Sequence, residues 1–189
     1  MHFATRTLGF AESPSKRHHE RMTKESLHEM VREVPDFPKQ GVLFRDISPI
    51  MASPAAMKAA CEVMVAPFKL DEIDCFAGIE SRGFILAGYL AGLFGKGFLP
   101  LRKAGKLPPP TLRQSYTLEY GQATLETHRG NARVLIIDDV LATGGTLQAA
   151  IDLCEIGGYT IQGCAVLIDL PGLNKFEFRG SRVHSVLQF

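Results

Sequence analysis

Several features that would place a chain in a common class are missing from these 189 residues. Neither charge is in excess, since 21 basic and 20 acidic residues leave a formal net charge of +1, and the basic residues do not gather on one helical face. A nucleic-acid partner is therefore not indicated. No apolar run approaches the length that crosses a bilayer, so a membrane partner is not indicated either.

Cysteine is scarce, and its spacing suits neither a metal site nor a disulfide framework. The four cysteines stand singly in apolar segments, without a Cys-x-x-Cys pair, at positions 61, 75, 154 and 164. This usage is typical of buried free thiols in a reducing compartment, so we expect a cytoplasmic protein without disulfides or a zinc site.

Two common phosphate-binding loops are also missing. No Gly-x-x-x-x-Gly-Lys-Ser/Thr motif occurs, because Gly105-Lys106 is followed by leucine and Gly95-Lys96 is followed by glycine. No Gly-x-Gly-x-x-Gly follows an expected strand. A nucleoside triphosphatase and a dinucleotide-binding enzyme are both disfavoured.

The length and composition suit one soluble domain with a sizeable core. Residues 1–21 are basic and polar with little to bury, so we expect a disordered tail there. Thr23 is a good N-cap, and the folded domain is expected to span residues 22–189.

The most informative stretch runs from Arg133 to Thr146. Its apolar run, Val134–Ile137, is short and lacks alternation, which indicates a parallel strand buried on both faces. The run stops at two carboxylates, Asp138 and Asp139, and a glycine-rich turn then leads into an amphipathic segment. We expect a strand, an acidic pair, a turn and a helix, in that order.

This order of features predicts a site for a phosphorylated sugar. In open parallel sheets, ligands bind outside the carboxyl ends of the strands, where this turn would lie. Turn amides and hydroxyls at a helix N-terminus would form a phosphate cradle from Ala142, Thr143, Gly144, Gly145 and Thr146. The neighbouring carboxylates would repel that phosphate unless they face sugar hydroxyls or a divalent cation. A phosphorylated ribose satisfies both halves, although an ordinary strand that ends in acids is the alternative.

Residues 133–146 resemble the phosphoribosyl-pyrophosphate signature of the type I phosphoribosyltransferases. The resemblance implies an α/β fold: a central, mostly parallel sheet flanked by helices, with a small N-terminal hood and a β-hairpin flap. It also implies that Asp138 and Asp139 hold the ribose and that residues 142–146 hold the 5-phosphate.

The expected hood follows a first helix. Leu27, Met30, Val31 and Val34 recur at helical spacing, and Pro35 is expected to end the helix.

Residues 35–47 then read Pro-Asp-Phe-Pro-Lys-Gln-Gly-Val-Leu-Phe-Arg-Asp-Ile. Such a stiff, aromatic segment suits a flat ligand, and a loop packed on the domain is an equal alternative. It resembles the hood of adenine phosphoribosyltransferases, which we expect at about 34–50. The resemblance implies that the Leu43 backbone binds the adenine edge, that Arg45 lies against the base and that Phe44 lines the pocket.

A second buried strand is expected at 73–79, ending in Glu80-Ser81-Arg82-Gly83 before another helical run. Alone, this turn is a weak signal, and a surface cap is the default interpretation. In the family it binds pyrophosphate, so the resemblance assigns that role to the Ser81, Arg82 and Gly83 amides and to the Arg82 guanidinium.

A cluster of cations, Arg102, Lys103 and Lys106, follows an expected strand at 97–101 and precedes three prolines. The cluster suits a polyanion, although a solvated loop is the alternative. The resemblance implies that these cations reach pyrophosphate, some of them from a neighbouring subunit.

Two runs with period-two alternation, 115–121 and 123–127, predict a β-hairpin. The resemblance makes the hairpin part of a flexible flap at about 102–128, with Glu119 as the catalytic acid/base.

The remaining pattern predicts helix 55–65, a glycine cap at 157–158, strand 160–168, a helical turn at 173–178 and a last strand at 183–187. Asp169, at the end of its strand, is expected near the base.

Taken together, the resemblance implies transfer of the 5-phosphoribosyl group from phosphoribosyl pyrophosphate to adenine, which gives AMP and pyrophosphate in purine salvage. It implies a homodimer and Mg²⁺, held mainly through the substrate, with Asp138 and Asp139 as candidate protein ligands. Two alternatives remain open: the same reaction with another purine base, and a non-catalytic regulator that senses phosphoribosyl pyrophosphate.

Overall fold

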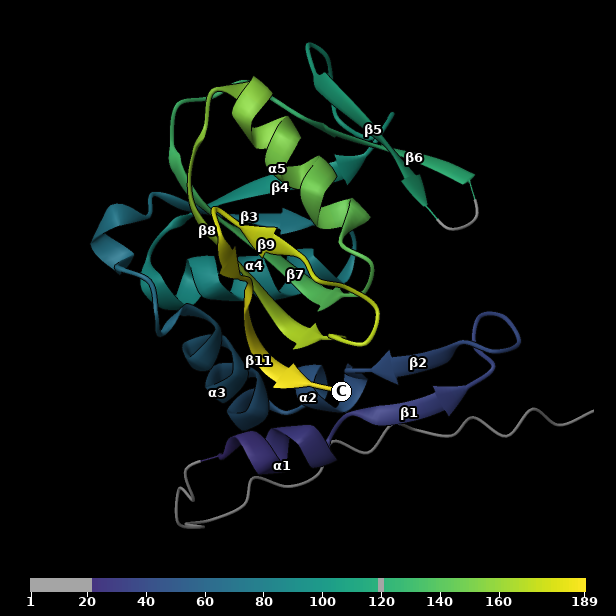
Figure 1. The fold of residues 1–189 in the computed structure, drawn as a ribbon. Helices are drawn as coiled ribbons and strands as arrows, with labels where there is room; N and C mark the ends of the chain where they lie inside the picture. Colours follow the sequence, from purple (N-terminus) through teal and green to yellow (C-terminus); the bar gives the residue numbers. More distant parts are fainter. Residues whose placement is uncertain (1–21, 119–120) are drawn as a thin grey trace, which may run out of the picture.

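The computed structural model describes residues 22–118 and 121–189 (Figure 1). The expected tail and Glu119 lie outside these residues. The fold is built on a seven-stranded sheet with the order β11-β8-β7-β3-β4-β6-β5. Its strands are β3 (Cys75–Ile79), β4 (Gly97–Lys103), β5 (Leu112–Leu118), β6 (Gly121–Thr127), β7 (Arg133–Leu141), β8 (Thr160–Asp169) and β11 (His184–Gln188). Pairing is parallel from β11 to β4 and antiparallel across β4, β6 and β5, which confirms the predicted, mostly parallel sheet.

Helices cover both faces of the parallel strands. They are α1 (Lys24–Glu29), α2 (Ser48–Ala52), α3 (Pro54–Val65), α4 (Arg82–Phe94) and α5 (Gly145–Gly157), with a 3₁₀ turn at Leu70–Glu72. Leu135 and Ile137 of β7 pack in the core that contains α3 and α4, whereas Val134 and Ile136 pack in the core that contains α5. All four side chains are 0% exposed, as the unbroken apolar run predicted.

The segment predicted as the hood, about 34–50, lies mostly in a separate antiparallel hairpin of β1 (Arg32–Pro35) and β2 (Leu43–Asp46), which we call the hood. The N-cap at Thr23 is confirmed, because its side chain accepts a hydrogen bond from the backbone N–H of Ser26. The predicted extension of the first helix to Pro35 is wrong, since α1 ends at Glu29. Val34 pairs with Phe44 across the hairpin instead, so a partner distant in sequence overrides the local helical spacing.

Other predicted boundaries need correction as well. Strand β7 does not stop before the acidic pair but continues through it to Leu141, because β8 pairs with it along this length. Strand β4 continues past 101 to Lys103, because β6 pairs with its last two residues. Residues 173–178 do not form a helical turn, because the last two belong to β9 (Glu177–Phe178), which pairs with β10 (Ser181–Arg182).

The predicted β-hairpin is confirmed as β5 and β6, with Ser115 opposite Thr124, and its role as a flexible flap stays a prediction. All four cysteines are free, and only Cys75 among them is not fully buried. Within residues 22–118 and 121–189, we find no helix with the length and apolarity needed to span a membrane.

Candidate active site

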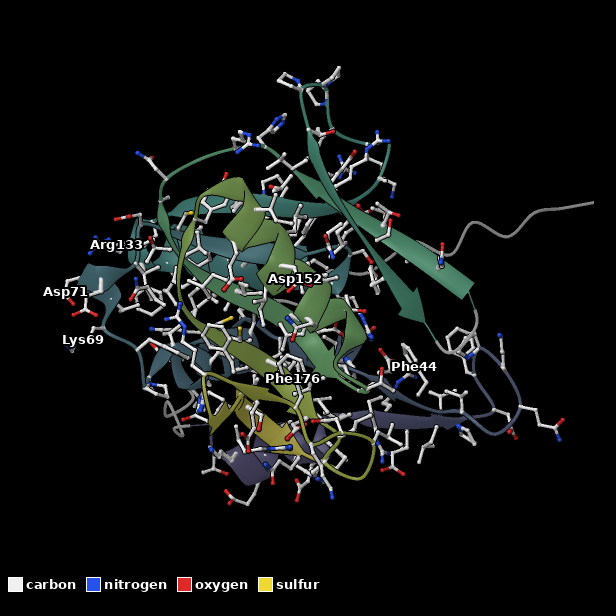
Figure 2. The ribbon with its side chains drawn as sticks, turned by 45° about the horizontal axis from the view of Figure 1, so that its top comes forward. Phe44, Lys69, Asp71, Arg133, Asp152 and Phe176 are labelled. Atoms are coloured by element: carbon white, nitrogen blue, oxygen red, sulfur yellow. The ribbon has the colours of Figure 1, made fainter. Side chains whose placement is uncertain are left out.

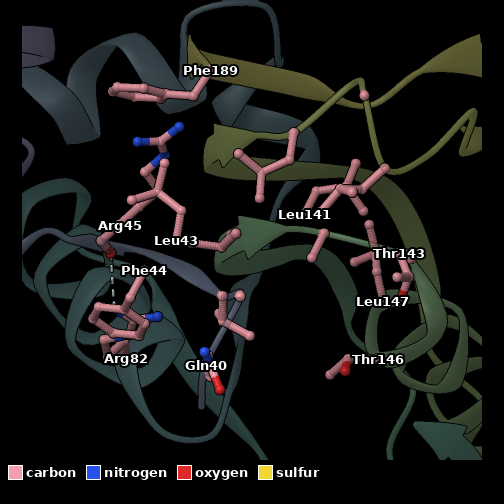
Figure 3. Close-up of a pocket in the computed structure, with 18 residues that line it drawn as sticks. Gln40, Leu43, Phe44, Arg45, Arg82, Leu141, Thr143, Thr146, Leu147 and Phe189 are labelled. Carbon is pink, nitrogen blue, oxygen red and sulfur yellow. Dashed lines mark hydrogen bonds between the residues drawn. The ribbon is translucent and has the colours of Figure 1, made fainter. Parts of the chain in front are cut away.

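A cavity of about 960 Å³ opens between the hood and the turn that precedes α5 (Figure 3). Its walls come from residues 40–45, 140–144, 146–147, 170 and 172–173, together with Arg82 and Phe189. The predicted ligand-binding residues that line it are Leu43, Phe44, Arg45, Arg82, Ala142, Thr143, Gly144 and Thr146. The other described candidates lie outside its wall: Ser81, Gly83, Arg102, Lys103, Lys106, Asp138, Asp139 and Gly145.

The phosphate cradle, residues 142–146, joins β7 to α5. Gly144 is its N-cap residue and has a φ of +91°, a conformation that favours glycine. A Cβ atom at Gly144 would also lie 2.5 Å from Cδ2 of Phe176, which packs under this end of α5 (Figure 2). Thr143 and Thr146 line the cavity beside it. The turn therefore offers backbone amides and hydroxyls at the N-terminus of a long helix, which suits an anion.

The acidic pair lies next to the cradle but is largely covered, with Asp138 and Asp139 each 8% exposed. Burial, followed by the charge of Asp139, raises the pKa of Asp138 well above its usual range. Gly83 packs tightly here, because a Cβ atom would lie 2.9 Å from the Ile137 carbonyl oxygen and 3.0 Å from Oδ1 of Asp138. The role of these carboxylates toward ribose stays a prediction.

Arg82 connects the acidic pair to the hood. Its Nη2 atom lies 2.6 Å from Oδ2 of Asp139, and its Nη1 atom donates to the Arg45 carbonyl oxygen at 3.4 Å. Its guanidinium also lies 4.8 Å from the ring centroid of Phe44 (Figure 3). The guanidinium thus connects β7 to the hood, and its predicted contact with pyrophosphate stays a prediction. The Glu80–Ser81 peptide bond before it is cis, which the sequence did not reveal.

The hood side of the cavity carries a residue that no motif marks, Phe189. The guanidinium of Arg45 lies 4.6 Å from the centroid of the Phe189 ring, and the His28 ring stacks on Phe189 with centroids 4.1 Å apart. Arg45 also forms an ion pair with Glu33 of β1. Phe189 therefore helps to place the hood residue that is predicted to contact the base.

A buried polar network supports the wall opposite the hood. Asp169, expected near the base, is itself buried and pairs with Arg182 at 2.8 Å. Nδ2 of Asn174 donates to Asp169 Oδ1 at 3.1 Å and to the carbonyl oxygen of Leu170 at 3.0 Å. Leu170 and Leu173 line the cavity. Asp169 therefore contributes to the cavity indirectly, because its network stabilises the loop that carries these two residues.

The predicted cations of the pyrophosphate site lie in what we call the basic turn, residues 102–107. Oε2 of Glu80 lies 3.4 Å from Nε of Arg102 and accepts from the backbone N–H of Lys103 at 3.0 Å. The Lys106 ammonium pairs with Oε1 of Glu80. Burial alone would raise the pKa of Glu80, but these donors outweigh it and lower the pKa below its usual value.

A second carboxylate, Glu126 of β6, holds the backbone of the basic turn. It is fully buried and accepts from the N–H groups of Lys106 at 2.6 Å and Leu107 at 2.7 Å. The N–H of Gly105, with those of Lys106 and Leu107, lowers the pKa of Glu126 to about 2, although burial opposes the shift. Neither acid was predicted, because their partners become neighbours only when β3, β4 and β6 pair.

Comparisons with known proteins agree with this geometry. A family model described as the phosphoribosyl transferase domain matches residues 50–177. A curated relative, the adenine phosphoribosyltransferase of Bdellovibrio bacteriovorus, is 52% identical over 163 residues, which are 86% of this chain and 99% of the relative. Two solved structures are similar as well. The adenine phosphoribosyltransferase of Rhodothermus marinus has a TM-score of 0.81 at 47% identity, covering 88% of this chain and 98% of that one.

The second is the enzyme of Giardia lamblia in complex with 9-deazaadenine, with a TM-score of 0.79 at 38% identity, covering 89% of this chain and 98% of that one. The classification rests on the matched domain and on high sequence identity over almost the whole length of each relative. The chain therefore belongs to the adenine phosphoribosyltransferase family.

Proposed function

We propose that this protein transfers the 5-phosphoribosyl group from phosphoribosyl pyrophosphate to adenine, releasing AMP and pyrophosphate in purine salvage. The observation that carries the proposal is the single cavity lined by both the phosphate cradle and the hood. One end offers amides and hydroxyls for a phosphate, and the other offers apolar and aromatic side chains for a flat base. The relatives' name and the 9-deazaadenine complex of the Giardia enzyme support adenine as the base.

The reaction displaces pyrophosphate from C1 of the ribose, so positive charge builds on the ring in the transition state. The cradle would hold the 5-phosphate, and Asp138 and Asp139 would face the ribose hydroxyls. The Ser81, Arg82 and Gly83 turn would bind the departing pyrophosphate. Holding both reactants at fixed positions supplies much of the rate enhancement, because the attacking nitrogen is already aligned with C1.

The cations of the basic turn, Arg102, Lys103 and Lys106, are proposed to complete the pyrophosphate site. They lie at the end of β4 or just after it, and the Glu80–Gly83 turn follows the end of β3, with which β4 pairs in parallel. Their positive side chains would stabilise the negative charge of the leaving group.

Proton transfer is assigned to Glu119, which lies outside the described residues. Adenine must lose a proton as N9 bonds to C1, and a carboxylate desolvated by flap closure would have a raised pKa suited to that exchange. Closure would also keep water from the activated ribose.

Magnesium is proposed as the metal, with most of its ligands supplied by the substrate. In residues 22–118 and 121–189, no three His, Cys, Asp or Glu side chains are grouped as a metal cage, and Asp139 is already paired with Arg82. This fits an ion held by pyrophosphate and ribose oxygens, with Asp138 and Asp139 as its candidate protein ligands. When bound, Mg²⁺ would neutralise charge on the leaving pyrophosphate.

We also propose that the protein works as a homodimer in the cytoplasm. Exposed apolar side chains of α4 and β4, Ile85, Leu93 and Phe98, offer a surface that a second copy could cover. Four free thiols suit a reducing compartment. Light scattering after gel filtration tests the dimer, and a monomer at micromolar concentration would contradict it.

The function is tested by incubating the protein with Mg²⁺, phosphoribosyl pyrophosphate and each purine base in turn. We expect AMP and pyrophosphate with adenine and much slower product formation with hypoxanthine or guanine. Faster reaction with a 6-oxopurine would overturn the base assignment. Tight donor binding without any product would favour the sensing regulator.

A further inference from the structure

Glu80 occupies a place that the proposed mechanism reserves for the leaving group. It follows β3 directly and precedes the Ser81–Gly83 turn, and its side chain is 9% exposed. Two side-chain cations, Arg102 and Lys106, converge on its two carboxylate oxygens. These are two of the cations that are proposed to bind pyrophosphate.

The backbone of the basic turn has other supports besides Glu80, which itself accepts from the N–H of Lys103 at 3.0 Å. Glu126 accepts hydrogen bonds from the N–H groups of Lys106 and Leu107, and β4 pairs with β6 at Arg102 and Lys103. The ion pairs to Glu80 therefore direct the side chains of Arg102 and Lys106. Its hydrogen bond to the Lys103 N–H is one of several contacts that hold the main chain, together with Glu126 and the sheet.

We propose that Glu80 is a built-in competitor of pyrophosphate for Arg102 and Lys106. This inference rests on the proposed function, because it takes these cations as the pyrophosphate ligands. Before the substrate binds, Glu80 holds the cations at the edge of the site and balances their charge. When a diphosphate arrives, the cations exchange one anion for another, and Glu80 is left beside it as a like charge that weakens its binding. After the transfer, Glu80 recaptures the cations and speeds the release of pyrophosphate.

The variant Glu80→Gln keeps the size of the side chain and removes the competing charge. We expect its dissociation constant for pyrophosphate, measured by titration calorimetry, to fall about tenfold. Turnover should fall severalfold because the product leaves more slowly, while the KM for phosphoribosyl pyrophosphate also falls. A purely structural role of Glu80 predicts the opposite change, which is weaker binding of both pyrophosphate and phosphoribosyl pyrophosphate.

A matched control exists at the other end of the same strand. Asp74 precedes β3 and pairs at 2.7 Å with Arg133. Figure 2 shows Arg133 on the opposite side of the molecule from Phe44 of the hood. Asp74→Asn changes the net charge by the same amount and also breaks an ion pair. Its pyrophosphate affinity should equal that of the wild type, and equal tightening in both variants would overturn the proposal as a mere net-charge effect.

Unchanged or weaker pyrophosphate binding by folded Glu80→Gln would also overturn it. A crystal structure of the wild-type protein with pyrophosphate gives a test that needs no variant. The Lys106 ammonium and Arg102 Nε should move from Glu80 to phosphoryl oxygens, and bound pyrophosphate with both contacts to Glu80 intact would contradict the inference. Failure of the proposed function is distinguishable, because it appears as absent AMP formation by the wild type.

Discussion

The two ends of the cavity are built in different ways. The phosphate cradle joins β7, whose central residues are buried on both faces, to α5, and it lies within the matched family model. The hood is a two-stranded hairpin at 32–46, which lies outside the matched residues 50–177. It is tied to the rest of the cavity by side chains, chiefly Arg82 and Phe189.

This difference suggests how the work of binding is divided. The cradle offers main-chain groups fixed by the sheet, so it suits the sugar phosphate that every reaction of this kind shares. The hood offers side chains held by ion pairs and ring contacts, so its shape can change with few substitutions. Base selectivity should therefore be the more easily altered property of the two.

The largest expected effect is a loss of turnover that leaves binding at both ends of the cavity unchanged. We expect Glu119→Ala to lower turnover about a hundredfold or more, since a positioned acid/base is lost, with little change in donor binding. Steady-state rates measure turnover, and calorimetric titration with phosphoribosyl pyrophosphate in the absence of adenine measures donor binding. Glu62→Ala, an exposed residue of α3, is the control. Normal turnover in the Glu119 variant would remove this residue from the mechanism.

The cradle should be intolerant of even a methyl group. Gly144→Ala combines a positive φ with a clash against Phe176, so donor and AMP affinity should fall roughly tenfold to a hundredfold. Gly180→Ala is a matched control, because Gly180 also has a positive φ, +76°, but no atom lies within 4 Å of the added carbon. Similar losses in both variants would show that backbone strain, and not the packing of the cradle, causes the effect.

A change at the hood end of the cavity should affect the binding of adenine and not that of the donor. Phe189→Ala removes the ring beside Arg45, and the KM for adenine should rise about threefold to tenfold while the KM of the donor stays constant. Phe178→Ala is the control. Its ring also contacts a guanidinium, that of Arg179 at 4.8 Å from the ring centroid, but Phe178 does not line the cavity. A rise in the donor KM of Phe189→Ala would break the proposed division between the two ends.

The smallest expected effect is a pH dependence of the stability that Asp46 of the hood contributes to the fold. Hydrogen bonds from Ser48, followed by that from Arg32, lower the pKa of Asp46 to about 2 from its usual 3.8. The ionised carboxylate therefore stabilises the fold above pH 3.8, and this contribution is lost as the pH falls toward 2.

Thermal unfolding of wild type and Asp46→Asn checks this linkage. The variant should melt a few degrees lower at pH 7, and the gap should narrow by pH 3. The deficit of Gly144→Ala should not narrow, because no titrating group causes it. An Asp46→Asn gap that stays constant with pH would contradict the account of the hood.

The cradle could be predicted because its signal is local. A continuous apolar run, two acids and a glycine turn lie within Arg133–Thr146, and the same segment forms β7, the turn and the start of α5. The hood was only half predicted. Its segment was identified, but Val34 was assigned to a helix, because the pairing with Phe44 is not visible in local spacing.

Contacts between distant segments could not be predicted at all. Arg82 and Asp139 are far apart in sequence and meet only where α4 packs on β7. Phe189 reaches Arg45 only because β11 lies at the end of the sheet nearest α1 and the hood (Figure 1). Such contacts depend on the chain topology, so they cannot be predicted from residue types and local spacing.

The most direct test of the two-ended cavity is a crystal structure with AMP. The account predicts the 5-phosphate against the amides of residues 142–146 and the adenine ring between Phe44 of the hood and Leu170. AMP bound elsewhere, with the cradle occupied only by water, would contradict it.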